Sequence, residues 1–160
     1  MHELDEIDLK ILGCLQVDCT QSIARISEQV GLSTTPCWRR LQRLESEGYI
    51  RERVALLDQE RLNLGVTVFV MIRTSQHNAT WLRKFQDTVT RMPEVVDCYR
   101  LSGEIDYLIR AVIPDIRAYD GFYKRLIENV DLLDVSSMFA MDNIKSTTRL
   151  PLDYARRALP

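Results

Sequence analysis

The stretch from residue 31 to residue 50, GLSTTPCWRRLQRLESEGYI, carries the side chains best suited to molecular recognition in this chain. Cys37, Leu41 and Leu44 recur at a spacing that puts them on one face of a helix. The opposite face is small, polar and cationic, and it contains Thr35, Arg39, Gln42 and Arg43. Arginine can donate two hydrogen bonds to guanine, and glutamine can bond adenine in the same way. The pattern therefore predicts a helix that reads the major groove of DNA.

The turn before this helix makes it the second helix of a helix-turn-helix. Gly31 ends a preceding helical pattern, for which Ser22 is the expected N-cap. The new helix opens with hydroxyl side chains that can hold phosphates, namely Ser33, Thr34 and Thr35. An ordinary solvated helix face is the alternative for Arg39, Gln42 and Arg43. Their place in a helix-turn-helix favours DNA recognition.

A wing is predicted after this helix, because Gly48 ends the helical pattern and residues 51–57, RERVALL, alternate as a strand does. The wing is expected to bring Arg51 and Arg53 to the side of the DNA-reading helix. Arg40 stands nearer the core edge, where it is expected to contact a phosphate or to form an internal ion pair. Residues 1–57 are thus predicted to be a winged helix-turn-helix domain whose first helix covers residues 3–15.

Two neighbours of these arginines have competing interpretations. Cys37 stands near a helix N-terminus, where a thiolate is stabilised and could act as a redox switch. Its phase with Leu41 and Leu44 instead favours a place in the core. Trp38 flanks the buried face, and we expect it to pack against the first helix.

The pattern changes after a linker at residues 58–65. From residue 66 to residue 146 the expected order is strand, helix, strand, strand, helix, strand, which is that of a ferredoxin-like sandwich. The strand at residues 67–73 is apolar on both faces, as expected if helices cover one face and another sheet the other. The second helix is expected to bury Ile116, Tyr119, Tyr123, Leu126 and Ile127. Residues 147–160 are predicted to add an edge strand and a tail, and the fold class is α+β.

The predicted hairpin between the second and third strands of this domain suits either a solvated turn or a ligand site. It contains Gly103, Glu104 and Asp106. Backbone N–H groups near a glycine can hold a carboxylate, and a nearby acid can hold an ammonium. A free α-amino acid presents both of these groups, so the hairpin is a candidate site for one.

Composition limits the partners. The formal net charge of this 160-residue chain is −2, so any affinity for DNA must come from local placement of charge. The acidic start and the lack of a membrane-length apolar run predict a cytoplasmic protein with no membrane partner. The cysteines have no zinc spacing, so no metal site is predicted. Without a Gly-rich phosphate loop or a nucleophile–histidine pair, we predict no enzyme, no catalytic residue and no cofactor.

The two halves together resemble a known family. STTPCWRRLQRLE and GYI in the first domain, with LSGEIDYLIR and SSMFAMDNIK in the second, resemble the Lrp/AsnC (feast/famine) transcription regulators over nearly the whole chain. The resemblance implies a bacterial or archaeal regulator that dimerises through its C-terminal domain, assembles further into octamers and binds an amino acid between subunits. TTPCWRRLQRLE with FYKRL and SSMFAM is similar to a branch associated with sulfur amino acids.

The resemblance also implies an effector site. It carries the effector role onto Ser102, Gly103, Glu104, Asp106, Tyr107, Ser136 and Ser137. The expected function is therefore a sequence-specific regulator that binds double-stranded DNA and responds to cysteine, methionine or leucine. The alternative is an architectural, nucleoid-type protein that wraps DNA with little sequence preference. An enzyme, or the regulatory subunit of one, is a third hypothesis that no motif supports.

Overall fold

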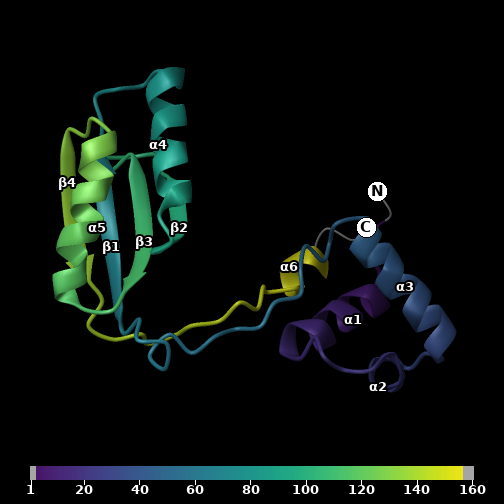
Figure 1. The fold of residues 1–160 in the computed structure, drawn as a ribbon. Coiled ribbons are helices and arrows are strands. Elements are labelled where there is room, and N and C mark those ends of the chain that lie inside the picture. Colours follow the sequence, from purple (N-terminus) through teal and green to yellow (C-terminus); the bar gives the residue numbers. More distant parts are fainter. Residues whose placement is uncertain (1–2, 157–160) are drawn as a thin grey trace. The chain divides into compact units, whose positions relative to one another are not determined.

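The computed structural model describes residues 3–156. Its N-terminal helices are α1 (Glu6–Val17), α2 (Ile23–Val30) and α3 (Thr34–Ser46) (Figure 1). The Ser22 side chain accepts a hydrogen bond from the Arg25 backbone N–H, and Gly31 ends α2 with φ 73°. Both predictions for α2 are confirmed, because glycine adopts this left-handed conformation without a Cβ clash. Asp5 caps α1, so that helix begins later than the sequence pattern predicted.

The core of these helices confirms the predicted phase of α3. Cys37, Leu41 and Leu44 are buried and pack in one cluster with Ile11 of α1 and Ile26 of α2. Ser33 stands at the N-cap position of α3, but its side chain makes no capping hydrogen bond. Its hydroxyl is therefore not used by the helix that it precedes.

The predicted wing strand is wrong. Residues 51–57 have no regular secondary structure, and Val54, Leu56 and Leu57 are 63%, 72% and 75% exposed. Within residues 3–156, the only sheet has the order β2-β3-β1-β4, and it does not include this segment. Alternation of residue types does not make a strand without a partner for the backbone N–H and C=O groups.

The second half of the chain has the predicted order of elements. These are β1 (Val66–Arg73), α4 (Ala79–Arg91), β2 (Val95–Arg100), β3 (Tyr107–Ile113), α5 (Ile116–Asn129) and β4 (Asp134–Phe139). Neighbouring strands in the sheet are antiparallel, and α4 and α5 cover one face of it (Figure 1). The predicted α+β class with a ferredoxin-like second domain is confirmed.

Only one face of β1 is covered. Val68, Val70 and Ile72 are buried under the helices, whereas Phe69 and Met71 on the other face are half-buried. The expected second sheet is absent from the part of the chain that the structure describes. The apolar residues of the second face are therefore left without a covering layer in the single chain.

The predicted inner face of α5 is partly wrong. Phe122 and Leu126 are buried, while Ile116 is 66% exposed and Ile127 is 40% exposed. Phe122 and Leu126 are four positions apart, so they form one stripe along the side of α5 that packs on the sheet. Ile116 and Ile127 lie outside this stripe. The prediction also omitted Phe122, although that residue is fully buried.

The chain divides into two units: Met1–Ala55 with Lys145–Pro160, and Leu56–Ile144. Instead of the predicted edge strand, the C-terminal segment forms a short helix, α6 (Asp153–Arg156), and belongs to the unit of α1, α2 and α3. That prediction is wrong for residues 147–156, and residues 157–160 lie outside the described part. No helix in residues 3–156 is long and apolar enough to cross a membrane.

Candidate functional site

The exposed side of α3 differs from the predicted one by one residue. It consists of Thr35, Trp38, Arg39 and Gln42, which we call the α3 face. These positions are spaced i, i+3, i+4 and i+7, and they lie opposite the buried residues of the helix. Trp38 is 52% exposed, so the expectation that it packs against the first helix is wrong. The α3 face therefore offers an aromatic ring beside a guanidinium and an amide.

Arg43 is the residue that the prediction placed wrongly. Its Nη2 donates to Asp8 Oδ2 at 2.5 Å, and its side chain is only 26% exposed. Arg40 Nη1 donates to Asp8 Oδ1 at 2.9 Å and to Asp5 Oδ2 at 2.5 Å. The Asp8 side chain is 0% exposed, and a buried carboxylate needs such partners. Arg43 thus points toward α1, and the internal ion pair predicted as one option for Arg40 is confirmed.

The acidic residues of this network were missed by the sequence analysis. Asp5 and Asp8 form a capping box, in which each side chain accepts from the backbone N–H of the other. Burial opposes ionisation of Asp5, but the Asp8 backbone N–H and the Arg40 guanidinium outweigh it and lower the pKa of Asp5. Hydrogen bonds to Asp5 and Asp8 raise the pKa of Arg40. The acids at residues 5 and 8, followed by a helix rich in arginine, were the available signal.

The other predicted DNA-binding residues are exposed. They are Ser33, Thr34, Arg51 and Arg53, in addition to Thr35, Arg39 and Gln42 of the α3 face. Arg53 pairs with Glu45 at 2.6 Å, and Gln42 donates to the same carboxylate at 3.0 Å. Neither Arg39 nor Arg51 forms any of the ion pairs found in residues 3–156, so Arg39 is the one arginine of α3 whose guanidinium is left for a ligand.

Cys37 is 0% exposed, and burial raises the pKa of its thiol. A thiol that is hard to ionise and out of contact with solvent is a poor redox sensor. The geometry therefore favours the core interpretation of Cys37.

The loop at residues 101–106 joins β2 to β3, and we call it the effector loop because it contains most of the predicted effector residues. Ser102, Gly103 and Glu104 are exposed, and Gly103 has φ 144°. Asp106 holds the loop to the end of β1: its N–H donates to the Ile72 carbonyl at 3.0 Å, and its Oδ2 accepts from the Thr74 N–H at 2.8 Å. The loop is thus anchored at Asp106 and open to solvent at its tip.

The remaining predicted effector residues lie on two different faces of the sheet. Tyr107 is 7% exposed, and its ring centroid is 4.5 Å from that of Phe85, in the core under the helices. Ser137 shares a hydrogen bond of 2.5 Å with the Tyr119 hydroxyl, also on the helix side. Ser136 is exposed and pairs in register with Met71 of the uncovered face. The structure therefore leaves Ser136 and the effector loop accessible, and it places Tyr107 and Ser137 in packing positions.

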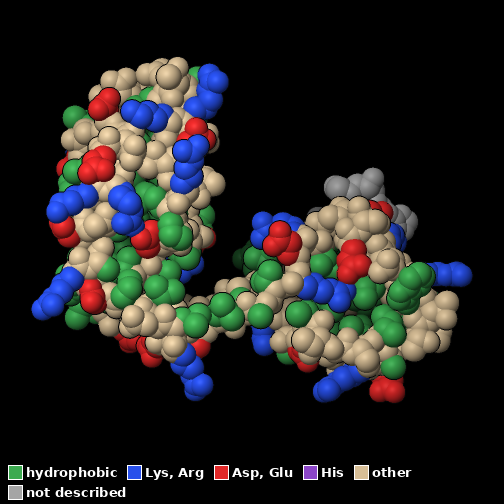
Figure 2. All heavy atoms as spheres, viewed as in Figure 1, with side chains coloured by type: hydrophobic (Ala, Val, Ile, Leu, Met, Phe, Trp, Pro, Cys, Tyr) green, Lys and Arg blue, Asp and Glu red, His purple; other side chains and the backbone are tan. Residues whose placement is uncertain are grey.

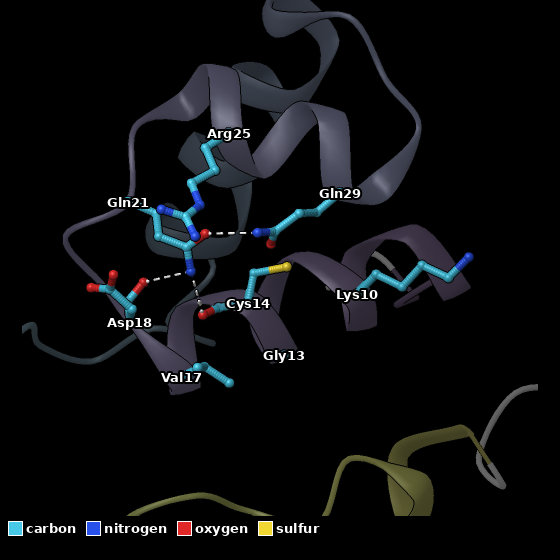
Figure 3. Close-up of a pocket in the computed structure, with 8 residues that line it drawn as sticks. All are labelled: Lys10, Gly13, Cys14, Val17, Asp18, Gln21, Arg25 and Gln29. Atoms are coloured by element: carbon cyan, nitrogen blue, oxygen red, sulfur yellow. Dashed lines mark hydrogen bonds between the residues drawn. The ribbon is translucent and has the colours of Figure 1, made fainter.

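The structure also shows a groove that the sequence analysis did not predict (Figure 3). It has a volume of about 610 Å³ and is lined by Lys10, Gly13, Cys14, Val17, Asp18, Gln21, Arg25 and Gln29. Gln21 Nε2 donates to the carbonyls of Cys14 and Asp18, and Gln21 Oε1 accepts from Gln29. These amides therefore bond one another rather than facing a ligand, and no predicted effector residue lines the groove.

Comparison with known proteins assigns both halves of the chain. The profile of the Lrp/AsnC ligand binding domain matches residues 67–150, and that of a winged helix-turn-helix DNA-binding domain matches residues 4–51. The chain is 51% identical over 151 residues to the DNA-binding transcriptional activator DecR of Escherichia coli (strain K12), covering 94% of this chain and 99% of DecR. It is 47% identical over 152 residues to the glutamate uptake regulatory protein of Zymomonas mobilis subsp. mobilis, covering 95% and 93% of the two chains.

Two solved structures are similar along most of the chain. The AsnC family transcriptional regulator from Agrobacterium tumefaciens matches with a TM-score of 0.92 and 57% identity, covering 94% of this chain and 99% of that one. A transcriptional regulator from Neisseria meningitidis, in complex with L-methionine, matches with a TM-score of 0.90 and 38% identity, covering 94% and 98%.

Proposed function

The chain belongs to the Lrp/AsnC family of DNA-binding transcriptional regulators, and we propose that it binds DNA through the α3 face and adjusts this binding when an amino acid occupies the effector loop. The observation that carries the proposal is the exposed Arg39 beside Trp38 on the second helix of a helix-turn-helix, because Arg39 forms no ion pair within the described residues 3–156. The relatives are regulators, which implies a role other than catalysis and gives no support to an architectural DNA-wrapping protein.

DNA binding by a single chain would depend on few cationic side chains. Arg40 and Arg43 are held by Asp5 and Asp8, so the phosphate-binding charge left to each chain comes mainly from Arg39 and Arg51. Each phosphate neutralised contributes a slope of about −0.9 to the salt dependence of the binding constant. A single copy would therefore bind weakly. We propose that a dimer presents two α3 faces to half-sites about one helical turn, or a multiple of it, apart.

Replacing Arg39 by alanine tests the proposed DNA binding through the α3 face. Loss of a bidentate contact to guanine is expected to cost about 1–3 kcal/mol on a selected operator and to weaken sequence preference. Arg83→Ala, an exposed change on α4, is the charge-matched control and should leave binding unchanged. The measurement is a titration of operator and scrambled duplexes at one salt concentration. Equal losses on both duplexes would remove Arg39 from base recognition.

We propose that the ligand of the effector loop is a free α-amino acid, with methionine, cysteine and leucine as the candidates. We propose no other cofactor. Backbone N–H groups around Gly103 are suited to the carboxylate, and Glu104 and Asp106 to the ammonium. The L-methionine complex of the Neisseria relative supports this ligand class. Of the two serines of β4, Ser136 is the exposed one and remains accessible to such a ligand.

A thermal-shift screen of the twenty amino acids identifies the effector, because a ligand that binds only the folded state raises its melting point. Asp106→Asn then tests the site. The asparagine oxygen keeps an acceptor for the Thr74 N–H but removes the negative charge, so loop anchoring and ammonium binding are separated. We expect DNA binding without effector to be unchanged and the response to the amino acid to be lost. A full response in this variant would exclude Asp106 from the site.

We further propose self-association, to a dimer or an octamer, through the uncovered face of the sheet. Phe69 and Met71 are half-buried there, and Met138 of β4 is 55% exposed. Met71→Asp should lower the sedimentation coefficient, because a charge would have to be desolvated in the interface. Arg83→Asp on the helix-covered side should not. Unchanged assembly in Met71→Asp would place the interface elsewhere.

A further inference from the structure

The C-terminal segment is bound to the last turn of α1, within the unit of α1, α2 and α3, which we call the DNA-binding unit. Gln16 Nε2 donates to the Leu150 carbonyl at 3.2 Å, and the Leu150 N–H donates to Gln16 Oε1 at 2.6 Å. One side-chain amide thus satisfies both backbone polar groups of Leu150, as a neighbouring strand would. The contact joins residues 134 positions apart in the chain.

A second contact lies one helical turn earlier on α1. Gly13 has no side chain, and a methyl group there would lie 3.8 Å from Leu152 Cδ1, which is van der Waals distance. Leu152 is half-buried, whereas the Leu150 side chain is 72% exposed. The segment is therefore held by the backbone of Leu150 and the side chain of Leu152.

The stretch before this contact is loosely held. The Ala140 N–H donates to the Thr67 carbonyl at the end of the sheet, and Met141 and Ile144 are then 97% and 95% exposed. The chain therefore passes between the two units twice, once after α3 and once after β4. Two connections that attach to different points of a body restrict its rotation more than a single flexible linker does.

We propose that Gly13 and Gln16 of α1 form a docking surface for the chain's own C-terminal segment, residues 150–156, and that this docking is a second tether that restrains the DNA-binding unit. The inference goes beyond the proposed function, because it concerns the connection between the units and needs no effector. The return connection starts at the end of β4, which carries Ser136.

Hydrogen exchange of the Leu150 amide in the full-length protein tests the docking. Gln16→Ala removes both hydrogen bonds, and we expect the Leu150 N–H to exchange about five- to tenfold faster than in the wild type. Leu152→Ala should have the same direction of effect. The matched control is Leu150→Ala, which leaves the backbone contact with Gln16 intact and should change nothing. An unprotected residue-150 amide in the wild type would overturn the proposal.

Nuclear relaxation of backbone amides tests the tether. In Gln16→Ala, the apparent correlation time of amides in α1, α2 and α3 should fall relative to that of amides in β1 and β3. Unchanged relaxation with faster Leu150 exchange would overturn the restraining role. If exchange protection of the Leu150 amide is lost on dilution, the segment docks onto a second copy of the chain. That result would overturn the proposal that the segment docks onto α1 of its own chain. None of these readouts depends on DNA or on an amino acid, so their failure is distinct from failure of the proposed function.

Discussion

Removing the negative charge of Asp8 is expected to destabilise the DNA-binding unit selectively. Asp8 is 0% exposed and accepts from Arg40 at 2.9 Å, from Arg43 at 2.5 Å and from the Asp5 N–H at 3.1 Å. In Asp8→Asn the volume and one acceptor oxygen remain, but both guanidinium groups lose their shared counter-charge. The variant therefore isolates the electrostatic link between α1 and α3.

The magnitude follows from burial. Removing one partner of a buried ion pair costs about 3–5 kcal/mol. Arg40 and Arg43 keep 28% and 26% of their side chains exposed, so they can regain part of their hydration. We therefore expect a loss of about 2–3 kcal/mol, below the full range for a buried pair. A unit of this size is stable by only several kcal/mol, so the loss is a large fraction of its stability.

Hydrogen exchange resolved by peptide measures this loss in each unit separately. The slowest amides of α1 and α3 should exchange about 30- to 150-fold faster, because each 1.4 kcal/mol corresponds to about tenfold. Amides of β1 and β3 should be unaffected. Asp120→Asn, which breaks an exposed pair with Lys124, is the control and should change nothing measurable.

A double-mutant cycle separates the charge effect from general strain. In an Arg43→Met background, Asp8→Asn should cost at least about 1 kcal/mol less than in the wild type, because one of the two charge partners is already absent. The reasoning is refuted if Asp8→Asn leaves exchange in α1 and α3 within twofold of the wild type. Full additivity in the cycle would also contradict a direct Asp8–Arg43 coupling.

Four further outcomes are expected. Because the pKa of Asp5 lies below its ordinary 3.8, its contribution to stability is complete above that pH and is lost as the pH falls through the lowered value. When the free energy of unfolding is followed down an acid titration, Asp5→Asn should therefore lose less stability than the wild type. Alkylation of native Cys37 should be much slower than in urea, and equal rates would contradict its burial. Gly103→Ala should lower stability by about 1 kcal/mol or more in a denaturant titration, because φ 144° is strained for alanine, and no loss would argue that the loop relaxes freely. If Trp38 contacts a thymine methyl group, replacing thymine by uracil in the operator should weaken the wild type but not Trp38→Ala, and equal effects would exclude that contact.

Local patterns were sufficient for most of the fold. Residue spacing predicted the buried stripe of α3, and turn chemistry predicted the cap at Ser22 and the end of α2 at Gly31. The order of strands and helices in the second domain also follows from periodicity, because each element must bury its own apolar face. The motifs were enough to place the chain in its family.

The errors share a physical cause, which is that partners distant in sequence are invisible to a local pattern. Residues 51–57 alternate like a strand but find no partner, and Arg43 has the character of a DNA-contacting residue but is held by Asp8, thirty-five residues away. The C-terminal segment is tethered by Gln16 rather than by a strand edge.

The sequence by itself identified the helix that is proposed to face DNA, the two-domain order and the loop that is proposed to take an amino acid. Only the tertiary structure decided which arginines remain available, because a guanidinium goes to a buried carboxylate that cannot stay unpaired. It also decided that Trp38 faces solvent, because the core positions of α3 are already filled by Cys37, Leu41 and Leu44.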